Sequence, residues 1–493
     1  MWRPVRRRLW NGRVATKEWK TTMPTSQTGV RFRAMLKFFI LGCGLALAVV
    51  STGRGHSTLA PSPCPDNPPV DITSPQVPTD VCVPDGFGGV PTKYFDDYSW
   101  RSFIALVWPT QQGQRGMPDI SQTVGGTGPR VFQTYKSAWE IFHNDGSAPV
   151  EWNVYEDKKF NACGQALDFG GLVLASFSKF GDIGQADFGH LVGPLVAQNN
   201  TYVRYLTGFN KTEFDKILSE QLFMRGNLGT DAKPLSFPVG ALDVKSAWVV
   251  IDGISHPERF YQTDALVLDP RSGKCEEKTV GLIGLHIVQK TPSRPQWIWS
   301  SFEQVDNIPQ PGASAPFTFN DGNGTPMPMK NPIGFPPPPT PPTKFNVQRL
   351  VDIAKSTKDT NAMYQAALRQ QGSVWQFYQL VMTQWPVPPN TPANDGSPAH
   401  TTPPLGSATA FANVTMETFD QTRIARGCMA CHNDTRNESD FLWALNDHAF
   451  PVLDPNFLLK EQAFRKLTDL LRMPEERLAT PQSHPAARVR RHR

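Results

Sequence analysis

The chain has 493 residues, of which 39% are hydrophobic and 11% aromatic, so it is long enough for about two or three domains with apolar cores. Its formal net charge is only +5, and arginines gather near the N-terminus and in the last six residues. A nucleic-acid-binding protein needs a basic patch within its fold, so we expect no nucleic-acid partner.

The N-terminal region has the pattern of an export signal. Residues 38–50 are an apolar run that follows Lys37, and a stretch of small residues after it ends at Ala60. This order is typical of a signal peptide, so we expect export through the Sec pathway to the periplasm, with residues 1–60 as the signal region and Met35 as an alternative start. The run is short for a bilayer, so we expect no integral membrane span after its removal.

The cysteines outside this region predict disulfide bonds. Two of the six sit in one short motif described below, and the others are Cys64, Cys82, Cys163 and Cys275. In an oxidising compartment four cysteines can form two bridges with three alternative pairings. We favour Cys64 with Cys82, because this bridge closes a short proline-rich loop.

Residues 61–306 are expected to form a β-rich body with N-terminal helices. Helical spacing of aromatic and aliphatic residues predicts helices, and alternation with β-branched residues predicts a hairpin and four further strands that form an antiparallel meander. The expected helices are 94–107, 131–142 and 212–224, the hairpin covers 191–207, and the strands are 241–251, 260–268, 279–289 and 296–302.

The second half of the chain reads as loops and helices. Residues 307–344 are rich in proline and glycine and predict a surface loop or linker. Residues 345–406 predict helices at 347–371 and 374–385 and then a proline-rich loop. Residues 407–473 are expected to be a small, mostly helical segment with an amphipathic helix at 456–472, before a disordered basic tail at 474–493. The expected fold class is α+β.

The motif Cys428-Met429-Ala430-Cys431-His432 indicates covalent haem c. Each thiol adds to one vinyl group of the porphyrin, and the histidine that follows becomes the proximal ligand of the iron. A zinc half-site needs a second pair of ligands at similar spacing, which the sequence lacks, and a redox dithiol needs a strand before a helix. We therefore predict one haem c bound by Cys428, Cys431 and His432, with His432 as the metal ligand.

The sixth ligand of the iron decides what such a haem does. A methionine or histidine in this position gives a low-spin electron carrier, whereas an open position lets peroxide, oxygen or a small gas bind. The candidates are Met416, Met473, His448 and His286, and the remaining alternative is an open site.

Two functions follow from these alternatives. The first is a periplasmic mono-haem cytochrome that transfers electrons to a redox partner protein. The second is a haem-dependent oxidoreductase that uses the β-rich body to bind peroxide, oxygen or a small organic substrate. Its acid–base groups would come from His286, Glu303 and Asp306, which could converge at one sheet edge, although polar residues that merely end the strands would look the same.

Four segments, together with the haem motif, resemble a family of exported proteobacterial cytochrome c proteins that have a large N-terminal body and one haem motif near the end. The segments are 100–109, 281–292, 297–307 and 378–386. The resemblance implies haem and export but supplies no substrate. The chain departs from an ordinary class I cytochrome c, in which a methionine loop precedes the last helix, because Met473 follows the last expected helix.

Overall fold

The computed structural model describes most of the chain between Cys64 and Pro451. The described residues are 64–85, 91–155, 159–176, 195–269, 272–310, 312, 316–323, 346–385, 412–418, 421, 428, 432 and 435–451. The chain divides into two units, residues 1–61 and 62–493, and the first lies outside the described residues.

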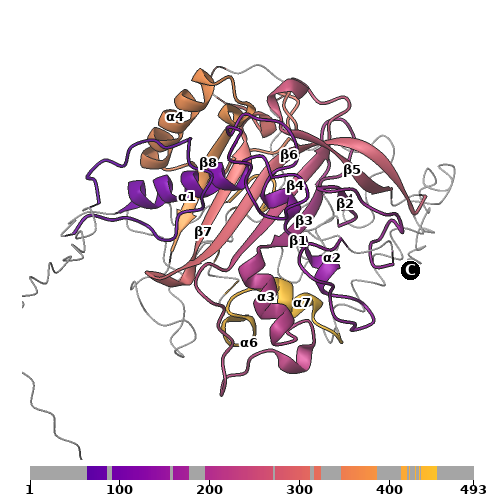
Figure 1. Cartoon of the computed structure of the whole chain (residues 1–493). Coiled ribbons are helices and arrows are strands. Elements are labelled where there is room, and N and C mark those ends of the chain that lie inside the picture. The colour runs from indigo at the N-terminus through magenta and orange to yellow at the C-terminus, as the bar shows by residue number, and fades with distance from the viewer. Residues whose placement is uncertain are drawn as a thin grey trace, which may run out of the picture. The chain divides into compact units, whose positions relative to one another are not determined.

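Eight strands of the described chain form one mixed sheet (Figure 1). They are β1 (Lys136–Ser137), β2 (Leu172–Leu174), β3 (Arg204–Phe209), β4 (Leu242–Val250), β5 (Gln262–Asp269), β6 (Lys274–Thr291), β7 (Arg294–Gln304) and β8 (Tyr378–Gln384). The long strand β6 is the centre: β4 pairs along one edge, and β5 and then β7 pair along the other. β8 extends the sheet beyond β7, and β3 and β1 extend it beyond β4.

The sheet curls back toward itself. β2 pairs with β5 as the one parallel pair among these strands. Just beyond β2, Ser176 forms a bridge with Tyr205 of β3, whose amide donates to the Ser176 carbonyl at 3.0 Å. Because β2 and β3 are the outer members of a series of five paired strands, this bridge brings the two ends of the series together.

Helices cover parts of the sheet. They are α1 (Thr92–Leu106), α2 (Ala138–Ile141), α3 (Lys211–Ser219), α4 (Lys355–Gln370), α6 (Arg436–Ser439) and α7 (Trp443–His448), and short 3-10 turns are Phe132–Thr134, Arg225–Asn227, Pro257–Arg259, Val305–Asn307 and Val374–Phe377. α1 packs against α4 and β8, whereas α3, α6 and α7 lie together at the other end of the sheet (Figure 1).

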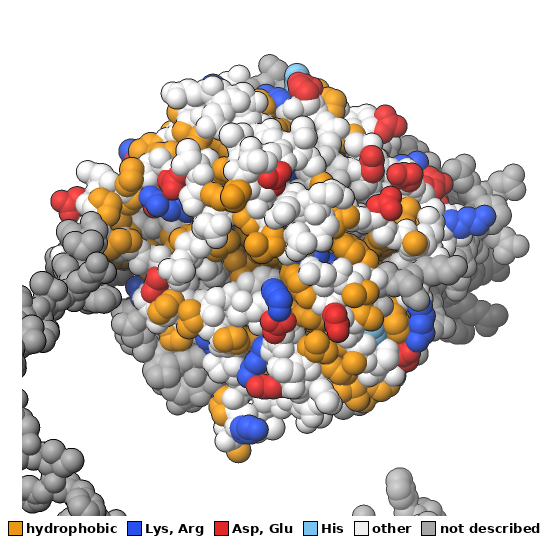
Figure 2. All heavy atoms as spheres, viewed as in Figure 1, with side chains coloured by type: hydrophobic (Ala, Val, Ile, Leu, Met, Phe, Trp, Pro, Cys, Tyr) orange, Lys and Arg blue, Asp and Glu red, His pale blue; other side chains and the backbone are white. Residues whose placement is uncertain are grey.

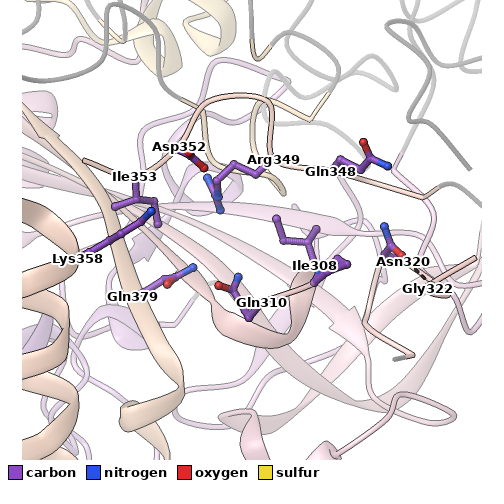
Figure 3. A pocket seen from close by; sticks show the side chains of 11 residues that line it. Ile308, Gln310, Asn320, Gly322, Gln348, Arg349, Asp352, Ile353, Lys358 and Gln379 are labelled. Carbon is purple, nitrogen blue, oxygen red and sulfur yellow. Dashed lines mark hydrogen bonds between the residues drawn. The ribbon is translucent and has the colours of Figure 1, made fainter. Parts of the chain in front are cut away.

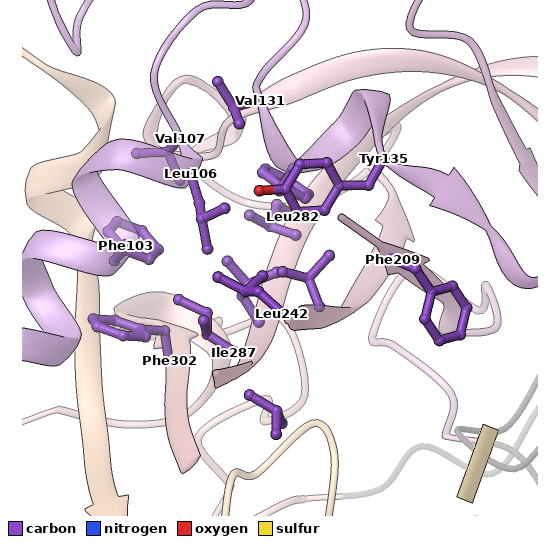
Figure 4. Close-up of a cluster of buried hydrophobic side chains, with 14 of the residues drawn as sticks. Phe103, Leu106, Val107, Val131, Tyr135, Phe209, Leu242, Leu282, Ile287 and Phe302 are labelled. Carbon is purple, nitrogen blue, oxygen red and sulfur yellow. The ribbon is translucent and has the colours of Figure 1, made fainter. Parts of the chain in front are cut away.

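The main core lies between α1 and one face of the sheet. Figure 4 shows Phe103 and Leu106 of α1, and Val107 directly after it, beside Leu282, Leu242 and Ile287 of the strands. The Phe103 ring stacks on Phe302 of β7 with centroids 4.4 Å apart. α1 forms because its aromatic and aliphatic residues recur at helical spacing, so that one side of the helix is apolar.

The opposite face of the sheet has a second apolar core. Along β4, Leu242, Val244 and Trp248 at even-numbered positions belong to the main core, while Ala247 and Val249 at odd-numbered positions belong to the second. This alternation follows from the two-residue period of a strand. A described piece of the later chain, residues 412–418, covers the second core with Val414 and Met416.

Most of the helices and strands expected between residues 61 and 306 are present, and the fold class of the body is α+β. The helix near 94–107 and all four strands between 241 and 302 are present. The expected antiparallel meander is wrong. In a meander each strand would pair with the next one in the chain, whereas β4 pairs with β6 and not with β5. β6 extends over 18 residues, so its first half can pair with β5 while its second half pairs with β4 and β7.

The prediction of a helix is wrong for two segments. Residues 131–142 form a 3-10 turn, strand β1 and the short helix α2, and residues 378–384 form strand β8. β8 is buried on both faces, so its sequence lacks the alternation that marks a half-exposed strand. The helices expected at 212–224 and 347–371 are shorter than expected, and the amphipathic helix at 456–472 lies outside the described residues.

The four cysteines outside the motif form two disulfides. Cys64 bonds to Cys82, which confirms the favoured pairing, and Cys163 bonds to Cys275, with Cα–Cα distances of 5.5 and 5.4 Å. The second bridge ties the segment before β2 to the start of β6. Within the described residues, no helix has the length and apolar character needed to span a bilayer.

Candidate haem site

The first motif cysteine lies against the last strand of the sheet. Cys428 is half-buried and packs against a cluster formed by Ile353, Val381 and Met382. The register of β7 and β8 shifts between Ser301 and Phe302, which leaves Val381 as an extra residue in β8. Bulges of this kind redirect side chains, and here the bulge lets Val381 and Met382 join the same cluster. Cys431 lies outside the described residues.

The motif histidine is oriented by two contacts. The His432 imidazole packs against the Trp299 indole of β7, with ring centroids 4.4 Å apart and planes at 55°. Its Nδ1 donates to the Phe441 carbonyl at 2.7 Å. Because a carbonyl only accepts hydrogen bonds, this contact selects, of the two neutral tautomers, the one protonated at Nδ1, whose Nε2 carries the lone pair. A histidine that ligates iron through Nε2 needs this tautomer, so His432 fits the proximal role.

A buried ion pair lies next to the Phe441 carbonyl that accepts the hydrogen bond from His432. Asp440, which precedes Phe441, pairs with Lys290 at the end of β6 and accepts a hydrogen bond from the Phe237 amide at 2.7 Å. Asp440 and Phe441 both have positive φ angles, 52° and 74°, which cost energy in a phenylalanine. Burial raises the pKa of the Asp440 carboxyl to about 6 against the attraction of Lys290.

The face of the sheet beneath the motif carries a row of polar and sulfur-containing side chains. Lys245 pairs in register with His286, His286 with Ser301, and Ser301 with Met382, so the row crosses four strands. Paired residues in neighbouring strands present their side chains to the same face. Trp299 lies two residues before Ser301 and therefore on this face too.

The sixth-ligand candidates have different surroundings. His286 lies in this row, with its Nε2 3.7 Å from Glu417 Oε2. His448, in α7, is half-buried beside Phe142, and burial followed by the positive charge of Lys245 lowers its pKa to about 4. Met416 is fully buried in the second apolar core. Met473 lies outside the described residues.

The expected convergence of His286, Glu303 and Asp306 is not what the structure contains. Glu303 is fully buried in an ion pair with Arg349 and accepts a hydrogen bond from Gln379 at 2.9 Å. Asp306 instead pairs with Arg259 at 2.9 Å. The three side chains take part in three separate pairs, so the interpretation of Glu303 and Asp306 as polar residues that end the strands is the better one.

A cavity of about 600 Å³ lies beside the Cys428 cluster. Ile353 belongs to both, and Figure 3 shows Arg349, Gln310, Gln379 and Lys358 around the same space. Most of the lining residues are polar, but the larger part of the wall surface is apolar, and Ile308, Pro309 and Ile353 are among the residues that line it.

Sequence reasoning missed Trp299 and Met382. Trp299 falls in the strand expected at 296–302, where nothing in the sequence marks it as a contact of the motif, and Met382 was hidden because residues 374–385 were expected to be a helix. The signal that could have found Met382 is the strand-like composition of β8, Tyr-Gln-Leu-Val-Met-Thr-Gln, in which β-branched and aromatic residues are frequent.

Among the described residues, no group of three or more His, Cys, Asp or Glu side chains is arranged to hold a metal ion. Comparison of the chain with protein-family models, with curated proteins and with solved structures finds no match.

Proposed function

We propose that this protein is an exported, periplasmic mono-haem c-type cytochrome that transfers electrons to a redox partner. The observation that carries the proposal is the pentapeptide from Cys428 to His432, together with the hydrogen bond from His432 Nδ1 to the Phe441 carbonyl. A redox dithiol gives no reason for a histidine directly after the second cysteine to be held in this tautomer, and a zinc site would need a second pair of ligands at similar spacing, which the sequence lacks. The resemblance to exported cytochrome c proteins points the same way.

In this proposal Cys428 and Cys431 hold the haem and His432 is the proximal ligand of its iron. When bound, the haem supplies a one-electron couple, whose potential depends on burial and on the axial ligands. Trp299 and the Phe441 carbonyl fix the orientation of the His432 ring. The finer architecture that we propose is a large, mostly antiparallel body with a small, mostly helical haem segment after it.

We propose Met382 as the sixth ligand. Its thioether belongs to the cluster on which Cys428 packs, it is 5% exposed, and it lies on the same sheet face as Trp299. Met416 is the less suitable methionine, because its side chain is enclosed by the second apolar core. A thioether opposite a histidine raises the reduction potential of a haem and suits an electron carrier.

One observation favours the alternative function, a haem-dependent oxidoreductase. His286 and Glu417 form a pair, 3.7 Å apart, on the sheet face that carries Met382 and Trp299. A histidine beside a carboxylate is a common proton-transfer pair, and an open haem near it could act on peroxide or a small organic substrate.

Optical spectra of the full-length holoprotein separate the two functions. The proposal predicts a low-spin ferric spectrum that cyanide leaves unchanged and a reversible one-electron titration. A high-spin spectrum that shifts on adding cyanide or peroxide would overturn electron transfer and favour the oxidoreductase. Met382→Ala should convert low spin to high spin, whereas the matched variant Met416→Ala should keep the low-spin spectrum. The opposite result would assign the ligand to Met416.

A further inference from the structure

Two carboxyl groups come close to each other at the end of the sheet where α3, α6 and α7 lie together (Figure 1). Glu213 is in the first turn of α3, and Asp243 is in β4. The Asn210 amide donates to the Leu242 carbonyl at 2.9 Å, and the Asn210 side chain accepts from the amides of Leu242 and Glu213 at 3.2 and 3.0 Å. This docking of α3 on β4 holds Glu213 near enough to Asp243 to feel its charge. We call these two residues the acid pair.

The Glu213 carboxyl is enclosed by protein and has no hydrogen-bond partner among the described residues. Its side chain is 0% exposed, and both of its oxygens are without such a partner. An ionised carboxyl loses its hydration in such a place without compensation, so burial favours the protonated form. Burial therefore raises the pKa of Glu213, and the charges of Asp243 and Asp440 raise it further. Glu213 thus holds a proton when Asp243 is ionised.

Asp243 is the more accessible member of the acid pair. It is half-buried, whereas Glu213 is fully buried. Burial raises the pKa of the Asp243 carboxyl to about 7, against the attraction of Lys245. Two adjacent carboxyls resist carrying two negative charges at once, so they titrate as one unit. The acid pair therefore exchanges one proton with water near neutral pH.

The acid pair is close to the aromatic ring that supports His432. Asp243 pairs in register with Val288, and Val288 pairs with Trp299, so these side chains lie on one face of the sheet. Neighbouring strands are about 4.8 Å apart, which places the backbones of Asp243 and Trp299 about 10 Å from each other. The Trp299 indole contacts the His432 imidazole. A change of charge at a haem held by His432 therefore acts on the acid pair, because charges about 10 Å apart interact appreciably inside a protein.

Two lysines and a further carboxylate face the acid pair. Lys245 lies two residues after Asp243 on the same face of β4, and Lys290 and Asp440 form the buried ion pair described above. Burial raises the pKa of Asp440 to about 6, against the attraction of Lys290, so Asp440 is ionised at neutral pH. These three groups therefore keep their charges while the acid pair titrates.

Two histidines and the charged residues of α3 complete these surroundings. Burial and then the charge of Lys245 lower the pKa of His448 in α7 to about 4, so its ring is neutral. His286, one row further along the sheet face, pairs with Glu417. Lys216 pairs with an acid one turn further along α3, and Figure 2 shows basic and acidic side chains next to one another on the surface over this helix.

We propose that the acid pair takes up one proton from water when the haem accepts one electron, so that the protein carries an electron and a proton together. This inference rests on the proposed electron-carrier function. The electron comes from the redox partner, and its negative charge favours the protonated form of a nearby carboxyl. One carboxylate oxygen of the pair becomes an O–H group, and this proton returns to water when the electron leaves.

Spectroelectrochemical titration of the full-length holoprotein at several pH values tests the proposal. We expect the midpoint potential to fall as pH rises through the neutral range, because the reduced protein binds the proton more tightly. One electron about 10 Å away changes a proton affinity by about tenfold, which corresponds to a total fall of about 59 mV for a one-electron couple. Glu213→Gln should remove most of this fall, because an amide does not titrate.

Two further variants keep the test specific. Glu213→Gln should fold, because the amide resembles the protonated carboxyl in shape and charge, and Asp243→Asn is a second variant at the more accessible position that should also reduce the fall. Asp215→Asn is the matched control. Asp215 lies on α3, is exposed and pairs with Lys211 at 2.6 Å, so its replacement should leave the wild-type pH dependence.

A reduced-minus-oxidised infrared difference spectrum gives a second readout. Reduction of the wild-type protein should increase the carbonyl band of a protonated carboxyl group, and Glu213→Gln should abolish this increase. A reversible couple whose midpoint does not vary with pH, or a wild-type fall in both Glu213→Gln and Asp243→Asn, would overturn the inference and leave electron transfer intact. A protein without a reversible haem couple would overturn the proposed function and this inference together.

Discussion

The imidazole of His432 packs on the indole of Trp299, a residue 133 positions earlier in the chain, with ring centroids 4.4 Å apart. The motif histidine is therefore positioned by the sheet and not only by its own segment. In the proposed cytochrome this gives the large body a defined role, because it fixes the orientation of the proximal ligand.

Trp299→Ala should change both stability and the haem signal. Removal of a buried tryptophan lowers the free energy of unfolding by about 3–5 kcal/mol, and the freed His432 ring should shift the g-values of the ferric haem in electron paramagnetic resonance. Trp100→Ala is the matched control, because Trp100 is fully buried against Tyr364 in the main core. It should lose similar stability with unchanged g-values, and identical spectra for both variants would contradict this role of Trp299.

Loss of the Asp440 carboxylate should be strongly destabilising. Asp440→Ala leaves Lys290, which is 3% exposed, as an uncompensated buried charge, and breaking such a pair costs about 3–5 kcal/mol. The double variant Lys290→Met/Asp440→Leu should recover most of the loss, because it removes both charges. Urea unfolding measures all three proteins. A loss below about 1 kcal/mol for Asp440→Ala would mean that the pair is not desolvated.

Asp96 should make stability depend on pH. It is fully buried, accepts hydrogen bonds from the hydroxyls of Thr357 and Thr383, and has a pKa raised by burial from 3.8 to about 7. Between these values the folded protein binds more protons than the unfolded chain, so the Asp96 contribution is present below about pH 4 and is lost as pH rises through about 7.

The expected loss is roughly 4 kcal/mol over that range, at about 1.4 kcal/mol per pH unit. Asp96→Asn removes the titrating group and should flatten this part of the pH–stability curve. Parallel curves for the two proteins between pH 4 and 8 would show that Asp96 does not titrate in this way.

The two disulfides should contribute unequally to stability. Their residues are separated by 18 positions for Cys64–Cys82 and by 112 for Cys163–Cys275. The chain-entropy model gives about 3 kcal/mol for the shorter loop and about 5 kcal/mol for the longer one. Replacement of each pair by serine, followed by chemical unfolding, measures both values. A larger loss for the Cys64/Cys82 pair would contradict the entropic explanation.

The sequence predicted the parts of the fold that alternation or spacing determines locally. β4, β6 and β7 were recognisable because β-branched and aromatic residues follow one another between turn signals, and α1 because its apolar residues recur at helical spacing. The strand order was not predictable, because β4 pairs directly with β6 although β5 lies between them in the sequence. Nothing local in β4 specifies this partner.

The candidate site was predictable only in its motif. Cys428, Cys431 and His432 follow from spacing alone, whereas Trp299 and Met382 reach the site through the pairing of β7 with β8. Both strands are buried on two faces, so neither side chain stood out in the sequence.

The pyridine haemochrome of the purified full-length protein tests the central proposal most directly. The protein is expressed with the periplasmic haem-attachment machinery, and the spectrum is recorded after acid–acetone extraction, which removes haem that is not covalently bound. We predict a c-type haemochrome with one haem per chain, which the Cys428→Ser/Cys431→Ser variant loses while its two disulfides and fold remain. A wild-type protein without covalent haem, or a double variant that keeps it, would contradict the account.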